Sequence, residues 1–205
     1  MLCRMLLLLF AEPYWKMHSQ TVFSVHPSFY VLVALSLFCL PINWVIGWLL
    51  ATGIHEFFHI LTLWILKIPI RSMHLCMSGA VIATGRITTP KEILCALAGP
   101  VGGLLTLLLL KVTPEIALCA SIQSFYNLLP IYPLDGGRAM KCIVTLIWGD
   151  ELAEKISKTL SVAVIILLGF GGIFLSYHFQ IGLLPLIFPA ILLLSVTYKN
   201  PLQRR

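Results

Sequence analysis

Charged residues are scarce in this chain. Lys, Arg, Asp and Glu together make up 11% of its 205 residues, whereas hydrophobic residues make up 59%. A soluble domain of this length could not keep so much apolar surface away from water, so the composition excludes an ordinary soluble globular protein. Aspartate is the scarcest of the charged residues, with only Asp135 and Asp150 in the chain.

Several other patterns are missing as well. The six cysteines include no C-x-x-C pair, so they predict buried packing residues, not disulfides or a thiolate metal site. No run of basic residues is dense enough to indicate nucleic-acid binding. No internal repeat, low-complexity tract or long polar tail is present. We therefore expect one membrane-embedded domain that covers residues 1–205.

The hydrophobic residues are gathered into long apolar runs. Each run approaches the roughly 20 residues that a helix needs to cross a bilayer. The six predicted spans are residues 23–40, 44–66, 93–110, 114–131, 160–177 and 181–198. These runs predict an all-α polytopic membrane protein with about six transmembrane helices in a lipid bilayer.

The basic residues predict the orientation of these spans. With six spans, both termini lie on one side of the membrane, and all 14 Lys and Arg residues except Lys111 fall on that side. Cytoplasmic loops carry an excess of Lys and Arg, so we expect both termini and the loops at 67–92 and 132–159 to be cytoplasmic. The net charge of +6 then reflects orientation and attraction to anionic lipid.

A metal-binding motif lies inside the second predicted span. His55 and His59 are four residues apart, so a helix places both imidazoles on one face, and Glu56 lies next to the first of them. Ionisable residues inside a span cost about 2.5–3.5 kcal/mol each, so three within five residues require a compensating partner. A metal ion such as Zn²⁺ is the simplest partner; a buried polar cluster used only for helix packing is the alternative.

A third metal ligand has to come from elsewhere in the chain. Catalytic zinc sites use three protein ligands and keep one open position, whereas His55 and His59 supply two. Asp135 directly follows the fourth predicted span and is the best candidate. The alternative role for Asp135 is to cap the helix that follows.

The residues around Asp135 predict an unwound segment. Pro130 and Pro133 interrupt helical hydrogen bonding, and Gly136 and Gly137 permit backbone angles that other residues resist. Irregular backbone at membrane depth is tolerated only inside protein or beside a water-filled cavity. We therefore expect Asp135 to lie in broken backbone near the cytoplasmic face, on the same side as the histidines.

The loop between the second and third spans has a different composition. Gly79 and Gly85 bracket a short β-branched run at 80–84, which predicts a short β-hairpin or edge strand at the cytoplasmic face. Such a strand could pair with an extended peptide by strand addition. A simple connecting loop is the alternative.

Three ordered motifs together resemble the site-2 protease family of intramembrane metalloproteases. They are the HEFFH sequence at 55–59, Ala-Gly-Pro at 98–100 and NLLPIYPLDGG from Asn127. Within the family, the stage IV sporulation protease type is the most similar, since it shares a Val-His-Pro sequence, here at 25–27, and six spans.

This resemblance implies a role for each site residue. His55, His59 and Asp135 would ligate Zn²⁺, Glu56 would be the general base, and Asn127 would hold the substrate backbone or the developing oxyanion. Asn127 could instead simply bridge helices.

The resemblance also implies a function. The chain would be an intramembrane zinc metalloendopeptidase that cleaves in or near the transmembrane segment of a membrane-tethered protein, as in regulated intramembrane proteolysis. The sporulation type adds transcription-factor activation, a bacterial cell membrane and membrane regulatory subunits as expectations. We expect the active site to open toward the cytoplasm.

Two departures from the family pattern are visible. Phe58 stands where the family commonly has a small residue before the second histidine. The sporulation type carries Pro-Phe-Gly-Gly in its hairpin and a nucleotide-binding CBS module after the last span, whereas this chain has Met-Ser-Gly-Ala at 77–80 and a short tail. We therefore expect no nucleotide partner.

Two other functions fit a membrane protein with these residues. One is a catalytically inactive relative that binds membrane clients, against which the intact HEFFH sequence and Asp135 argue. The other is a metal-ion transporter, which would require polar groups in several spans and on both sides of the membrane. The predicted ionisable cluster is single and one-sided, which favours hydrolysis.

Overall fold

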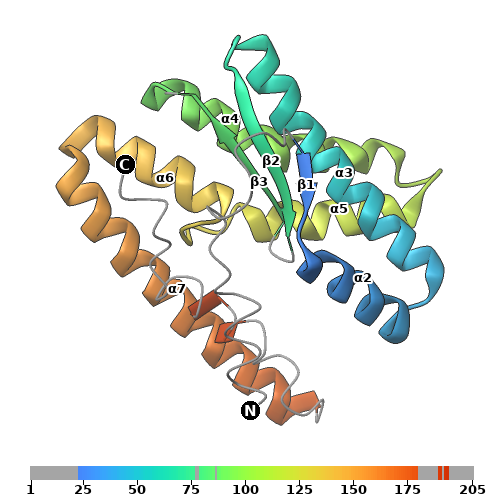
Figure 1. Ribbon diagram of the computed structural model, residues 1–205. Helices are drawn as coiled ribbons and strands as arrows, with labels where there is room; N and C mark the ends of the chain where they lie inside the picture. The colour runs from blue at the N-terminus through green and yellow to red at the C-terminus, as the bar shows by residue number, and fades with distance from the viewer. Residues whose placement is uncertain (1–22, 77–78, 86, 180–188, 191, 194–205) are drawn as a thin grey trace.

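The computed structural model describes residues 23–76, 79–85, 87–179, 189–190 and 192–193. These residues form a mainly helical structure with one small sheet (Figure 1). In chain order the elements are β1 (Phe23–Val25), α2 (Pro27–Cys39), α3 (Ile42–Ile65), β2 (Ile70–Cys76), β3 (Gly79–Thr84), α4 (Thr89–Leu105), the 3₁₀ helix η2 (Thr106–Leu109), α5 (Pro114–Asn127), α6 (Asp135–Trp148) and α7 (Asp150–Phe179).

Within the described part of the chain, three helical segments are long and apolar enough to cross a membrane. They are α3, the continuous segment Thr89–Leu109 formed by α4 and η2, and α7. They correspond to the second, third and fifth predicted spans, which supports a membrane protein. Helices α2 and α5 overlap the first and fourth predicted spans but have only 13 and 14 residues. The sixth predicted span, 181–198, lies almost wholly outside the described residues, so a total of six spans stays a prediction.

The hairpin expected between the second and third spans is present. Strands β2 and β3 pair antiparallel, from Ile70 opposite Thr84 to Cys76 opposite Gly79. A third strand, β1, pairs parallel to β2, which gives the sheet order β1-β2-β3.

The apolar run at 23–40 predicts that the β1 residues form the start of the first span. Helix α2 instead begins at Pro27, since proline has no N–H to satisfy in the first turn of a helix. The His26 side chain caps this helix by accepting a hydrogen bond from the Ser28 N–H. The three residues before His26 are therefore extended and free to pair with β2.

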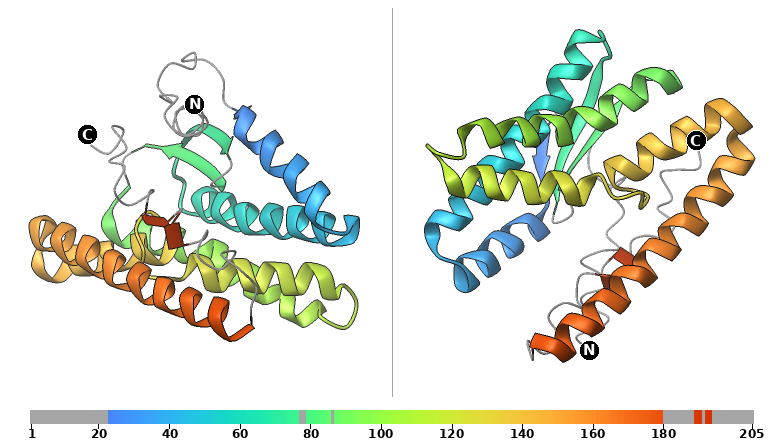
Figure 2. Two further views of the ribbon diagram at one scale, coloured as in Figure 1. Left: turned by 90° about the horizontal axis from the view of Figure 1, so that it is seen from below. Right: turned by 180° about the vertical axis from the view of Figure 1, so that it is seen from behind.

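Helix α3 is at the centre of the helical part. It packs against both α4 and α5, α4 also packs against α6, and α6 packs against α7. Figures 1 and 2 show α6 and α7 side by side, on the opposite side of the molecule from α2. Leu63 of α3 and Cys95 of α4 are buried together, and Ile70 and Ile82 of the sheet pack against them. The hairpin is thereby fixed onto α3 and α4.

The connection from α5 to α6 is only partly as predicted. Residues 128–134 are not α-helical, but α6 begins at Asp135, so Gly136 and Gly137 are helical and not unwound. Both glycines are instead required by close approach. A Cβ at Gly136 would overlap the carbonyl of Leu128, and one at Gly137 would overlap the backbone of Ile131. The lack of side chains therefore lets the connection fold back on the first turn of α6.

Candidate metal centre

The two histidines of the HEFFH sequence lie one turn apart on α3. Both are buried, with 4% and 9% of the residue surface exposed for His55 and His59. Their Nε2 atoms are 3.1 Å apart. The four-residue spacing therefore does place both imidazoles on one face of a helix, as the sequence predicted.

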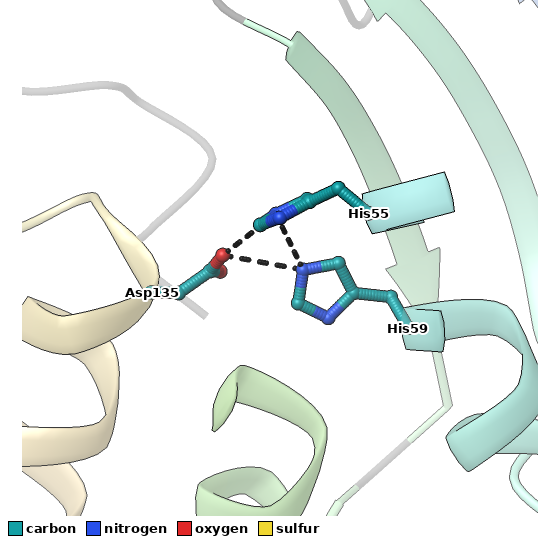
Figure 3. A group of neighbouring side chains, drawn as sticks. All are labelled: His55, His59 and Asp135. Carbon is teal, nitrogen blue, oxygen red and sulfur yellow. Dashed lines mark hydrogen bonds and ion pairs between the residues drawn. The ribbon is translucent and has the colours of Figure 1, made fainter. Parts of the chain in front are cut away.

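Asp135, the first residue of α6, completes this group. Its Oδ2 atom lies 3.1 Å from His55 Nε2 and 3.2 Å from His59 Nε2 (Figure 3). It is buried, and its carboxylate points toward the imidazoles. The N-cap residue of α6 is Leu134, so Asp135 does not take the alternative role of capping residue.

The three ligand atoms fit a metal ion. Their separations of 3.1, 3.1 and 3.2 Å form a nearly equilateral triangle. Ligands at about 2.0 Å from a tetrahedral ion lie about 3.3 Å apart, which is close to these values. Among the described residues this is the group of histidine, cysteine and carboxylate side chains that could hold a metal.

A backbone carbonyl fixes the tautomer of one ligand. His59 Nδ1 donates to the carbonyl oxygen of Cys95 on α4, at 2.7 Å. Neutral His59 therefore keeps its proton on Nδ1 and presents a lone pair at Nε2, as metal-ligating histidines do. His55 Nδ1 is buried without a hydrogen-bond partner among the described residues, so His55 lacks a comparable restraint.

The electrostatics of α6 favour a carboxylate and a neutral thiol near the site. Burial raises the pKa of Asp135, but hydrogen bonds to His55 and His59 outweigh that effect and hold it well below its ordinary value. Burial and the nearby Glu92 carboxylate raise the pKa of Cys142 to about 11. Asp135 is therefore available as an anionic ligand, whereas Cys142 remains a protonated packing residue.

Glu56 lies outside the triangle of ligand atoms. Its Oε1 accepts a hydrogen bond of 3.3 Å from the Ala80 N–H, at the start of β3. The sequence places Glu56 directly after His55, as the candidate general base; it did not predict the contact with the hairpin. The bond joins α3 directly to β3, an edge strand of the sheet.

Asn127 also lies at the site. It is the last residue of α5, and its Nδ2 is 3.4 Å from His55 Nε2. A third helix, α5, therefore also places a polar side chain next to the ligand atom of His55.

Gly99, in the Ala-Gly-Pro sequence of α4, lies against the same group. A Cβ at Gly99 would overlap Nε2 of His59 and lie 2.7 Å from Nε2 of His55. Small residues such as these permit close approach of helices in membranes. Their position beside the histidines shows that Gly99 makes room for the ligand atoms.

Two charged residues near the site were not identified from the sequence. The Oε1 atom of Glu92 is 3.4 Å from Nη2 of Arg138. Arg138 Nη1 is in turn 3.9 Å from Oδ1 of Asp135. The only available signal was the three-residue spacing from Asp135 to Arg138, which places both on one face of a helix.

Together, the fold and the site define a helical membrane protein with a buried His-His-Asp group suited to a metal ion. No protein-family model matches the chain, and no curated protein matches it. A solved structure described as a site-2 protease from Methanocaldococcus jannaschii is similar, with a TM-score of 0.65 and 19% sequence identity over 87% of this chain and 90% of that chain. At this identity the likeness shows a shared fold, and it does not distinguish the sporulation type.

Proposed function

We propose that this protein is an intramembrane zinc metalloendopeptidase of the site-2 type. The observation that supports it is the convergence of His55 and His59 of α3 with Asp135 of α6 on one point, while Glu56 stays outside the triangle. This arrangement has three ligands for a metal and a further carboxylate, Glu56, on the same helix as two of them, which suits metal-assisted hydrolysis. The shared fold agrees with it.

Each residue has a distinct part in the proposed reaction. His55, His59 and Asp135 would hold the metal, which supplies Lewis acidity and lowers the pKa of a water molecule toward 7. Glu56 takes a proton from the attacking water and returns it to the leaving amine. Asn127 binds the substrate backbone or the developing oxyanion beside His55.

The proposed substrate is a membrane-tethered protein that is unwound at the cleaved bond. In a helical substrate the carbonyl is already hydrogen-bonded, so a local loss of helix has to precede attack. Strand β3 is at the edge of the sheet, and its first residues contact Glu56. We propose that an extended substrate segment pairs with this edge. From the Lys and Arg distribution, both termini and the site opening would be cytoplasmic, in a bacterial cell membrane.

Metal content tests the ligand set without knowledge of the substrate. Protein purified in detergent should contain about one zinc per chain, since the three ligands bind one ion. Asp135→Ala should lose the metal. The matched control is Asp150→Ala, which removes the other aspartate of the chain, an exposed residue at the start of α7. Metal-free, well-folded wild-type protein would contradict the proposal.

Cleavage tests the role of Glu56. The assay uses proteoliposomes and a reporter with one transmembrane segment that carries Gly and Pro near its cytoplasmic end. Glu56→Gln should keep the metal and slow cleavage by about 10²–10⁴-fold, the range for loss of a general base. If Glu56→Gln binds metal and cleaves the reporter as fast as the wild type does, Glu56 is not the base. Metal binding without cleavage of any membrane protein would favour the inactive client-binding relative.

A further inference from the structure

A continuous set of contacts joins the metal ligands through α4. His59 Nδ1 donates to the Cys95 carbonyl at 2.7 Å, and Glu92 precedes Cys95 by three residues on α4. Glu92 Oε1 is 3.4 Å from Arg138, which follows Asp135 by three residues on α6. Asp135 Oδ2 then returns to His59 Nε2 at 3.2 Å. This closed series of contacts therefore links the histidines of α3 to Asp135 of α6 through α4, a helix that supplies no ligand.

The two oxygens of Asp135 face different groups. Oδ2 faces the imidazoles, at 3.1 and 3.2 Å, whereas Oδ1 faces Arg138 Nη1 at 3.9 Å. Attraction by the guanidinium therefore opposes rotation of the carboxylate that would turn both oxygens toward the metal. Glu92 holds the guanidinium from the other side through Nη2.

The chemistry of arginine suits this position. Its planar guanidinium offers several N–H donors in a fixed fork, so one group can face two carboxylates in defined directions. The Arg138 and Glu92 side chains are 38% and 35% exposed, and ion pairs at such exposure contribute little to folding stability. The main effect of Arg138 should therefore be on the geometry of Asp135.

We infer that Arg138, held by Glu92, is a positioning residue that fixes the Asp135 carboxylate with a single oxygen toward the metal. The inference rests on the proposed metal site and adds two residues to it, neither of which contacts the metal. Partners that orient metal ligands typically change metal affinity by about 10- to 100-fold when removed.

Metal affinity of the full-length protein in detergent is the first measurement. Zinc dissociation constants are determined by competition with a chelator for the wild type, Arg138→Gln and Lys141→Gln. Lys141 is the matched control, because it follows Arg138 by one turn and lines the same small cavity as Arg138 and Glu92. Its Nζ atom lies over the Tyr132 ring, 5.2 Å from the ring centre, instead of beside Asp135. Arg138→Gln should bind zinc about 10- to 100-fold more weakly, and Lys141→Gln should bind as the wild type does.

A spectroscopic measurement separates positioning from general structure. The visible absorption of the Co²⁺-substituted protein reports the number and arrangement of its ligands. Arg138→Gln should shift this spectrum, and Arg138→Lys should restore it only in part, because lysine lacks the rigid planar fork that holds two carboxylates in defined directions. Glu92→Gln should shift the spectrum in the same direction as Arg138→Gln.

The outcomes distinguish this inference from the proposed function. Wild-type protein that binds no metal would overturn both. Wild-type affinity and an unchanged cobalt spectrum in Arg138→Gln would overturn the positioning role and leave the protease proposal intact. If Arg138→Gln fails to fold, Glu92→Gln decides the question by the same two measurements.

Discussion

At residue 99 the chain has no side chain, and the two imidazole rings occupy the space that one would fill. Gly99 belongs to α4, whereas both histidines belong to α3, so the two helices can approach only because this position is glycine. Small residues permit such close helix approach in membranes. Gly99 is therefore as necessary for the shape of the site as the ligands are.

Replacing this glycine should damage the site. In Gly99→Ala the added methyl overlaps His59 Nε2 and crowds His55 Nε2, so the ligands are displaced. Overpacking costs about 1–3 kcal/mol, which corresponds to about 5- to 150-fold weaker metal binding. Metal affinity by chelator competition measures the effect.

Gly53→Ala is the control for this substitution. Gly53 lies on α3, two residues before His55, and nothing lies within 4 Å of a Cβ added there. It should bind metal as the wild type does. Equal affinity of Gly99→Ala and Gly53→Ala would show that the space at residue 99 is not needed.

The sequence predicts the ligands better than the residues around them. His55 and His59 follow from their spacing, and Asp135 follows because the chain has only one other aspartate. The pairing of Glu92 with Arg138 could not be predicted, since it joins residues 46 positions apart on helices whose relative position is set by packing. The contact of Glu56 with Ala80 depends in the same way on where the hairpin lies.

Between elements, the contact of α3 with α4 accounts for the unusual Phe58. The sequence departs from the family pattern by placing this large residue before the second histidine. In the structure, Gly102 of α4 lies against the Phe58 ring, and a Cβ at Gly102 would overlap that ring. The large residue on one helix is thus matched by the absence of a side chain on the other.

These two residues should be energetically coupled. Gly102→Ala should destabilise the protein by about 1–3 kcal/mol through overpacking. The double variant Phe58→Ala/Gly102→Ala should recover part of this loss, because the smaller side chain leaves room for the new methyl. Thermal unfolding in detergent gives the interaction energy from a double-mutant cycle.

Phe57→Ala is the matched control for the cycle. Phe57 is the neighbouring phenylalanine on α3 and is 57% exposed, so it faces away from Gly102. Its substitution should be additive with Gly102→Ala. Additivity in the Phe58 cycle as well would contradict the proposed match between the helices.

The long apolar helices and the local hairpin were predictable, whereas the shortest strand, β1, was not. The runs that form α3, α4 with η2, and α7 are long enough to be recognised by composition alone. Strand β1 has three residues, and its partner β2 begins 45 residues later, so nothing local indicates the pairing. Gly136 and Gly137 suggested unwound backbone, since glycine permits unusual backbone angles. In the structure they are helical, and they are needed because a side chain there would overlap the backbone of the preceding connection.

At the scale of the whole molecule, the distribution of Lys and Arg between the two sides of the membrane predicts its orientation. The described connection after α3 contains Lys67, and the connection after η2 contains Lys111. The excess of Lys and Arg on one side predicts that residue 67 is cytoplasmic and residue 111 is outside.

Cysteine labelling in intact cells tests this orientation. Lys111→Cys should react with a membrane-impermeant maleimide added outside, whereas Lys67→Cys should react only after the membrane is opened. Labelling of the parent chain, which has six cysteines, is the background to subtract. The reverse pattern would mean that the active site opens on the other side of the membrane.

The separation of the ligands along the chain has a consequence for biosynthesis. Asp135 leaves the ribosome 76 residues after His59, which takes about 4–15 s at 5–20 residues per second. Until then the nascent chain carries two histidines and no third ligand, and α6 has not yet docked. A newly made molecule therefore cannot complete its metal site until residue 135 has been made and α6 has docked against α4.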